Sequence, residues 1–194
     1  YLFFAFTQQA YWQAYNSEVS SPFRENNYEP ELILMLPHYK NYEEAASRII
    51  SLSLSHQSNG RAGELSRSWN RLKLSWVTSI GNVFINFEPW YRFKEDEKDS
   101  PQDPNGDDNP DITKYMGWFE LSAAYKQKDA TWRMMLRNNL RSDNKGAVRI
   151  SYSKPFNKHV RFYAELFNGY GESLIDYNRS VTRLGIGFEL NDIL

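Results

Sequence analysis

The sequence predicts an all-β fold, an antiparallel transmembrane β-barrel, and three observations favour it. Apolar residues recur at every second position in ten segments, so each predicted strand has one apolar and one polar face. Long and short connections between these segments alternate, as in barrels with long loops on one side of the membrane and short turns on the other. The polar faces carry Arg, Lys and Glu, which can pair inside a barrel but would be costly in the dry core of a soluble β-sandwich.

Composition excludes several other classes. The chain has 194 residues, 41% of them hydrophobic and 24% charged, and a formal charge of −1. No apolar run approaches the roughly 20 residues of a membrane-spanning helix, and the near-zero charge gives no reason to expect a nucleic acid partner. There is no cysteine, which excludes disulfides and thiolate chemistry. The mild hydropathy does not argue against a barrel, because only alternate residues of its strands meet lipid.

The first three predicted strands span residues 1–12, 28–38 and 50–58. Their apolar faces contain Leu2, Phe4, Phe6, Gln8, Ala10 and Trp12 in the first strand, Tyr28, Leu32, Leu34 and Leu36 in the second, and Ile50, Leu52, Leu54, His56 and Ser58 in the third. Glu29 and Glu31 occupy the opposite face of the second strand, and serines occupy that of the third. We therefore expect these carboxylates and hydroxyls to point into the barrel.

The next three predicted strands span residues 69–78, 83–92 and 114–126. Their apolar faces contain Asn70, Leu72, Leu74 and Trp76, then Val83, Ile85, Phe87 and Tyr91, then Tyr115, Phe119, Leu121, Ala123 and Tyr125. The opposite faces carry Arg71, Lys73, Glu88, Arg92, Lys114, Glu120 and Lys126. Both signs of charge are present, so a paired polar network is expected inside.

The last four predicted strands span residues 132–141, 148–153, 159–166 and 182–190. Trp132, Met134, Leu136 and Leu140 alternate with Arg133, Arg137 and Arg141, and the three strands that follow show the same period of two. No helix is needed to account for the chain.

The connections differ in length in a regular way. The long ones are expected at 13–27, 57–68, 93–112 and 168–180, and the short ones at 39–45, 79–82, 127–129 and 155–158. The tight link at 142–145 is the exception. Aromatic residues gather near the ends of the apolar stripes, where the interfacial girdles of membrane barrels form.

His56 and Ser58 lie on the apolar face at the long-loop end, and Asn70 has the same parity at the same end of the next strand. A loop at 59–68 allows His56 and Asn70 to be cross-strand neighbours, with side chains about 5 Å apart. A serine becomes a nucleophile when an imidazole takes its proton and a third group orients that imidazole. Asn performs this role without adding a charge that lipid would oppose. The ordinary alternative is that these are interfacial polar residues.

The motifs carry a specific resemblance. The strings HQSNGR and SRSWNR, together with SSPFRENNYEP, DDNPDITKYMG and GYGESLIDYN, resemble the hallmark stretches of the outer-membrane phospholipase A family. The similarity runs from TQQAYWQ to LND, nearly the whole chain. It implies a twelve-stranded barrel in the bacterial outer membrane that hydrolyses acyl esters of phospholipids and lysophospholipids, requires calcium and is activated by dimerisation.

The resemblance also implies roles for individual residues. Ser58 matches the nucleophile, His56 the base, Asn70 the orienting residue and Gly60 the residue whose N–H helps to bind the oxyanion. Calcium would take the Arg61 carbonyl and the Ser66 hydroxyl, plus the Ser20 hydroxyl from the partner subunit. Hard oxygen ligands of this kind suit calcium. The active site would lie at the outer-leaflet side of the membrane.

Some features depart from the family pattern. Gln57 stands where relatives can carry Asp, and Gly63 stands where an acidic residue would help a second calcium position, so weaker calcium binding is expected. Ten strands are visible where the family has twelve, and the chain opens inside a strand pattern without an initiator Met. We therefore expect a single barrel domain over 1–194 that lacks its first N-terminal strands, with its closure in doubt.

Three further features are open to interpretation. Within the acidic run at 94–111, Asp107 and Asp108 are the best calcium candidates, although most of this run fits a solvated loop. The interior charges fit a polar plug, whereas the rival hypothesis, a passive porin-like channel, uses them as an ion path. A soluble ligand-binding barrel is a third hypothesis.

Gln8 is the single amide in the apolar stripe of the first strand. An unpaired amide facing lipid costs about 1 to 3 kcal/mol. One interpretation places it near the interface or bonds it to a neighbouring strand. The other pairs two copies of Gln8 across a twofold axis, which makes this strand the seam of a homodimer and brings Ser20 to the calcium site of the partner.

Overall fold

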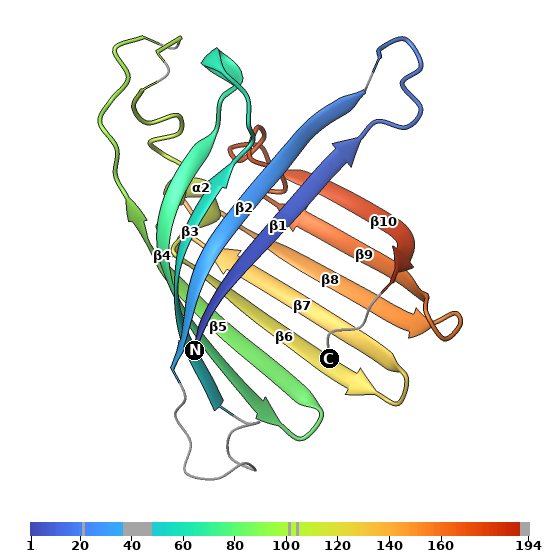
Figure 1. Ribbon diagram of the computed structural model, residues 1–194. Coiled ribbons are helices and arrows are strands. Elements are labelled where there is room, and N and C mark those ends of the chain that lie inside the picture. The colour runs from blue at the N-terminus through green and yellow to red at the C-terminus, as the bar shows by residue number, and fades with distance from the viewer. Residues whose placement is uncertain (21, 37–47, 101, 104, 191–194) are drawn as a thin grey trace.

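A computed structural model describes residues 1–20, 22–36, 48–100, 102–103 and 105–190, which form one ten-stranded antiparallel sheet (Figure 1). Each strand is hydrogen-bonded to the strands next to it in sequence. The strands are β1 Leu2–Trp12, β2 Phe23–Leu36, β3 Arg48–Ser58, β4 Ser68–Ile80, β5 Val83–Phe93, β6 Phe119–Gln127, β7 Ala130–Asn138, β8 Gly146–Pro155, β9 Arg161–Gly169 and β10 Val181–Glu189. The predicted all-β class and the ten strands are confirmed.

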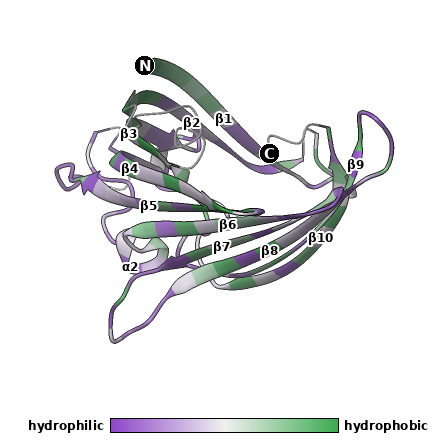
Figure 2. Cartoon of the chain, turned by 90° about the horizontal axis from the view of Figure 1, so that it is seen from below, coloured by the Kyte–Doolittle hydropathy of each residue, from purple (hydrophilic) through white to green (hydrophobic). Residues whose placement is uncertain are grey.

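The sheet curves around an interior but is not closed (Figure 2). Its edges are β1 and β10, which do not pair with each other in the described part of the chain. Because the order is a simple antiparallel meander, the connections after β1, β3, β5, β7 and β9 lie at one end of the sheet, and those after β4, β6 and β8 lie at the other. The predicted turn at 39–45 and the end of the second predicted strand lie outside the described residues.

The outer faces of the strands are apolar and the inner faces are polar, the reverse of the arrangement in a soluble protein. Along β3, Leu52 and Leu54 are exposed on the outer face, whereas Ser53 and Ser55 are buried on the inner face. The same holds in β4, where Leu74 is exposed and Lys73 is 7% exposed. An outer face of this kind suits hydrocarbon, since the polar groups turn inward. The predicted parity is therefore confirmed.

The inward charges are paired, as the sequence predicted. The Glu29 carboxylate accepts from Arg71 Nη2 at 2.6 Å, from Ser55 Oγ at 2.7 Å and from Lys73 Nζ at 3.2 Å. Lys73 Nζ also lies 2.5 Å from Glu31 Oε1 and 3.5 Å from a Glu88 oxygen. Four neighbouring strands, β2 to β5, are thus joined through one buried cluster of opposite charges. On the other side of the interior, Glu165 and Glu189 pair with arginines.

Two short helical segments correct the expectation that no helix is present. They are the 3-10 helix η1, Gly63–Leu65, and α2, Thr113–Met116. The prediction that the sixth strand begins near Lys114 is wrong for the same reason: Ile112 and Met116 are one helical turn apart, and both are buried in the same cluster. The chain turns at Gly117, whose φ is 75°, and enters β6 two residues later. None of the helices in the described ranges is long and apolar enough to cross a bilayer.

The connection after β7 is longer than the predicted tight link at 142–145. The seventh strand ends at Asn138 and not near Arg141. The buried side chain of Asn139 explains this, because its Oδ1 accepts from the N–H groups of Arg141 and Lys145. These bonds replace a strand ladder with a turn, and Leu140 takes a positive φ of 51°. The exception to the alternation of long and short connections is therefore smaller than expected.

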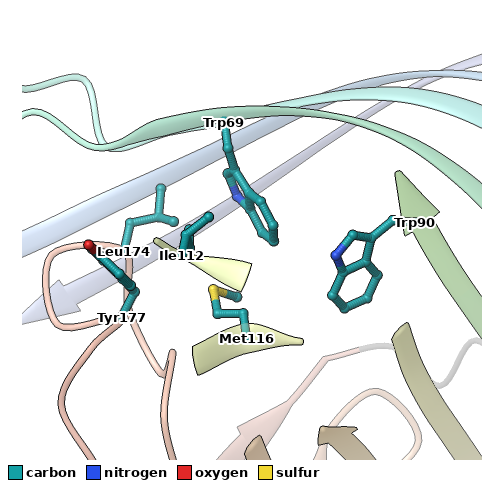
Figure 3. Packing of buried hydrophobic residues seen from close by; sticks show 6 residues of the cluster. All are labelled: Trp69, Trp90, Ile112, Met116, Leu174 and Tyr177. Atoms are coloured by element: carbon teal, nitrogen blue, oxygen red, sulfur yellow. The ribbon is translucent and has the colours of Figure 1, made fainter. Parts of the chain in front are cut away.

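An apolar cluster fills the interior at the long-loop end of the sheet (Figure 3). Its members come from β4, β5, α2 with the residue before it, and the connection after β9: Trp69, Trp90, Ile112, Met116, Leu174 and Tyr177. The two indole rings meet edge to face at 6.1 Å, and the Arg71 guanidinium lies 4.1 Å from the centre of the Trp69 ring. The long connections thus fold inward over the mouth and are anchored there.

The buried charge cluster predicts a large stability effect at Glu29. Replacing Glu29 by Ala leaves Arg71 without its carboxylate in a buried setting, and we expect a loss of about 3 kcal/mol in unfolding free energy. Urea unfolding in detergent micelles measures it. Glu18→Ala, in an exposed connection, is the matched control and should change stability by less than about 0.5 kcal/mol. If Glu29→Ala lowers stability no more than Glu18→Ala does, then Glu31 and Glu88 alone compensate the charges of Arg71 and Lys73.

Candidate active site on the outer face

The register of β3 and β4 sets His56 directly opposite Asn70. The two side chains meet on the exposed outer face, with His56 Nδ1 2.8 Å from Asn70 Oδ1. An amide oxygen only accepts, so this contact requires a proton on His56 Nδ1, and in the neutral imidazole Nε2 then has the lone pair. The structure therefore brings together two of the three predicted triad residues, which are joined by this hydrogen bond.

The inner face explains why the register is fixed at this point. One residue along each strand, Gln57 and Trp69 are also partners, and Trp69 Nε1 donates to Gln57 Oε1 at 2.7 Å. Trp69 is fully buried in the mouth cluster. A slip of one residue would turn Trp69 outward, so the buried pair holds His56 and Asn70 on the outer face. Gln57, noted above as a departure from the family pattern, therefore serves the interior.

Ser58 follows on the same face at the last position of β3, half-buried between Tyr28 on β2 and Ser68 on β4. Within the described ranges, its hydroxyl makes no hydrogen bond, to His56 or to any other residue. The hydroxyl is therefore free to rotate. Bonds between nucleophile and base are often long until substrate binds.

Gly60 lies in the turn directly after Ser58 and has a φ of 64°. A side chain there would be strained by this backbone conformation, and its Cβ would come within 3.1 Å of the Tyr28 ring. No acceptor for the Gly60 N–H is found among the residues that the structure describes. A free N–H beside the serine is the kind of donor that an oxyanion requires.

Asn59 organises the connection that carries Gly60, Arg61 and Ser66. Its side-chain Nδ2 donates to Glu25 Oε1 at 2.9 Å and to the Leu65 carbonyl at 2.8 Å. Its Oδ1 accepts from the N–H groups of Arg61 and Arg67. Sequence reasoning missed this residue, although its place between Ser58 and Gly60 and its known preference for turns were available signals.

The calcium candidates are partly brought together. Ser66 Oγ donates to Asp108 Oδ2 at 2.7 Å, and Ser68 Oγ donates to the same oxygen at 3.1 Å. Lys98 Nζ lies 2.5 Å from Asp108 Oδ1. Burial alone would raise the pKa of the Asp108 carboxyl, but hydrogen bonds from Lys98, Ser66 and Ser68 outweigh burial and hold the pKa below its usual value. In the single chain, the Asp108 carboxylate is thus paired with the Lys98 ammonium and with two hydroxyl groups.

The other candidates lie apart in the single chain. No donor reaches the Arg61 carbonyl oxygen among the described residues, so it is available as a ligand. Ser20 is exposed in the connection after β1 and makes no hydrogen bond to Ser66 or Arg61. Among the residues described, no group of three or more His, Cys, Asp or Glu side chains could hold a metal ion. The candidate set depends instead on hydroxyl and carbonyl oxygens with one carboxylate, a donor set that fits calcium.

Two further residues near the site, besides Asn59, were not found from the sequence. Glu95 Oε1 accepts from Asn70 Nδ2 at 2.8 Å, and Lys98 meets Asp108. Both lie in the acidic run, which sequence reasoning treated largely as a solvated loop. Glu95 continues the outward parity of Tyr91 and Phe93, and that parity was the available signal.

The sheet has an apolar outer face and a charged interior, which is the arrangement of β-barrel membrane proteins. Its outer face carries Ser, His and Asn, residue types that serine hydrolases use. The chain belongs to the phospholipase A1 family, whose model matches residues 1–190.

Individual relatives agree with this assignment. Phospholipase A1 of Escherichia coli (strain K12) is 42% identical over 189 residues, which cover 97% of this chain and 62% of that protein. The solved outer membrane phospholipase A of Escherichia coli superposes with a TM-score of 0.86, covering 100% of this chain and 71% of that one. The Salmonella typhi outer membrane phospholipase, solved as a dimer with bound calcium, is 40% identical with the same TM-score and the same coverage of both chains. The present chain thus spans about three fifths of the length of its curated relatives.

The hydrogen bonds of Asn59 predict a local effect. Asn59→Ala removes two donated and two accepted bonds from the connection between β3 and β4, so this segment should loosen while the sheet stays folded. Trypsin should then cut after Arg61 or Arg67 at least several times faster than in the unmodified protein. Glu64→Ala, in the same connection, is the control. Unchanged cleavage in Asn59→Ala would show that packing, and not this side chain, holds the segment.

Proposed function

We propose that the protein is a calcium-dependent outer-membrane phospholipase that hydrolyses acyl esters of phospholipids and lysophospholipids. The observation that carries the proposal is the His56–Asn70 hydrogen bond on the outer face. His56 lies two residues before Ser58 on the same face of β3. A catalytic group on a lipid-facing wall meets substrates that themselves lie in the membrane. Since longer loops of such barrels are extracellular, the site belongs at the outer-leaflet side.

The reaction follows from the roles of the three side chains. Ser58 Oγ attacks the ester carbonyl carbon while His56 Nε2 takes the hydroxyl proton, and the imidazolium then protonates the departing alcohol oxygen. Water, deprotonated by the same nitrogen, attacks the acyl-enzyme, releases the fatty acid and restores Ser58. Asn70 holds the imidazole in position throughout. The N–H of Gly60 would bind the oxyanion of both tetrahedral intermediates.

Calcium, where bound, would stabilise the negative charge that develops on the carbonyl oxygen. Arg61 would hold it through its carbonyl and Ser66 through its hydroxyl, with Asp108 adding a carboxylate. For Asp108 to do so, the Lys98 ammonium must give way, because both cations compete for the same oxygens. The Salmonella typhi relative supports the choice of metal, since that protein was solved with bound calcium.

Dimerisation is the second requirement of the proposal. Gln8 is exposed on the outer face of β1, opposite Tyr28, and its amide makes no hydrogen bond to any described residue. In lipid, a second Gln8 across a twofold axis would satisfy it. The seam would also carry Ser20 of each chain towards the partner's calcium site, which makes the site complete only in the dimer. The dimer of the Salmonella typhi relative supports this arrangement.

The proposal predicts that Ser58→Ala and His56→Ala each abolish ester hydrolysis in mixed micelles containing calcium. Both variants should keep heat-modifiable migration on gels, because neither side chain supports the sheet. An active-site-directed sulfonyl fluoride should label Ser58. Near-normal activity in Ser58→Ala, or labelling elsewhere, would overturn the assignment of the nucleophile. A passive porin-like channel predicts no hydrolysis with or without calcium.

The proposed seam makes a separate prediction for Gln8. Gln8→Ala should weaken dimerisation and raise the calcium concentration needed for half-maximal activity, without altering the fold. One polar pair in lipid contributes about 1 kcal/mol, so roughly a fivefold shift is expected. Sedimentation in detergent, with calcium and a covalent Ser58 ligand, measures the dimer fraction. Gln9→Ala, on the opposite face of β1, is the control, and a dimer fraction that does not change in Gln8→Ala removes this residue from the seam.

A further inference from the structure

Glu95 stands next to the candidate triad without a role in it. The strand β5 sets Phe93 opposite Asn70, and Glu95 follows two residues later on the same outward parity. Its Oε1 accepts from Asn70 Nδ2 at 2.8 Å. His56 on β3, Asn70 on β4 and Glu95, two residues after the end of β5, thus lie in a row across the outer face.

The direction of the hydrogen bonds between these three side chains depends on Glu95. An Asn side chain has an oxygen on one side and an NH2 group on the other, and it can turn over so that the two exchange places. An ionised carboxylate only accepts hydrogen bonds, so it requires the NH2 group of Asn70 to face it. The Asn70 oxygen must then face His56. Without the carboxylate, the amide could present its NH2 group to His56 Nδ1 and favour the wrong tautomer.

The correct tautomer is essential to the base. With its proton on Nδ1, His56 has a lone pair on Nε2, the nitrogen that remains for Ser58. With the amide turned over, Nδ1 would accept from Asn70 and the proton would sit on Nε2, where it blocks proton transfer. One carboxylate at the loop end therefore fixes the direction of the whole chain of hydrogen bonds.

We propose that Glu95 is a positioning residue for the triad, which orients the Asn70 amide and, through it, the tautomer of His56. The inference rests on the proposed function and names a fourth residue for the same site. None of the other described acidic side chains of this connection makes a hydrogen bond to Asn70. Asp107 pairs with Arg92, and Asp108 with Lys98. The position therefore matters, and not only the negative charge of the run.

The first test is kinetic and uses the full chain in mixed micelles with saturating calcium. Glu95→Ala should lower kcat about tenfold and leave KM unchanged, since a hydrogen bond to a charged group is lost away from the substrate. Asn70→Ala should retain measurable activity, and adding Glu95→Ala to it should cause no further loss. Glu95→Gln, which keeps an acceptor but can itself turn over, should fall between Glu95→Ala and the unmodified enzyme.

The matched control is Glu97→Ala, which removes the same charge from the same connection and should leave kcat unchanged. Multiplicative losses in the Asn70→Ala, Glu95→Ala double variant would overturn the proposal, because Glu95 would then act independently of Asn70. So would a loss in Glu97→Ala as large as that in Glu95→Ala, which would assign the effect to overall charge.

The second test does not depend on activity. The chain has three histidines, so ¹⁵N-histidine NMR in detergent micelles resolves few signals, and His56→Ala assigns the one of interest. At neutral imidazole, His56 should be the Nδ1–H tautomer in the unmodified protein and a mixture in Glu95→Ala. The same pure tautomer in both would overturn the proposal. A pure tautomer in the unmodified protein and a mixture in Glu95→Ala, with no ester hydrolysis by the unmodified protein, would contradict the proposed function and not the role of Glu95.

Discussion

The rest of the structure depends on one constraint, the requirement that most polar side chains turn away from the outer face of the sheet and find partners inside. A strand offers only two directions, so each apolar residue that faces outward forces its neighbour inward. The inward residues of β2 to β5 include like charges, and they are stable together only because Arg71 and Lys73 lie between the carboxylates of Glu29, Glu31 and Glu88. Breaking such a cluster leaves a buried charge without compensation, which is far more costly than the loss of a surface ion pair.

The same constraint makes the exceptions informative. His56, Ser58 and Asn70 stay on the outer face although they are polar, and inward contacts hold them there. The buried pair of Gln57 and Trp69 fixes the register one residue away. A polar group that would be better solvated elsewhere is thus retained by packing on the opposite face. Uncharged Asn suits this position, since a bare carboxylate in direct contact with lipid would be much more expensive.

The connections at the mouth add a second layer of support. The Glu25 carboxylate on β2 accepts one hydrogen bond from the Asn59 side chain and another from the Ile175 N–H, which lie in two different connections. The Tyr177 hydroxyl of the second connection donates to Asp111 of a third, and burial, together with that bond, raises the pKa of Tyr177. Hydrogen bonds therefore link the loop that carries Gly60 and Ser66 to the other long connections, which fold inward at the same end of the sheet. A site on the outer wall can be rigid because its loop is anchored from inside.

The sequence by itself determined the strands, the face of each residue and the meeting of His56 with Asn70, because a period of two and a short connection leave little freedom. It failed at 23–27, expected in a connection but found at the start of β2, at Tyr115, expected in a strand but found in α2, and at the end of β7. There, buried contacts of Met116 and Asn139 decide the backbone, and alternation carries no record of them. Only the tertiary structure showed the hydrogen bond from Trp69 to Gln57, and placed Glu95 against Asn70 and Lys98 with Ser66 on Asp108. These contacts join residues from separate strands and a long loop, whose path is set by the three-dimensional packing of the mouth and by no local pattern.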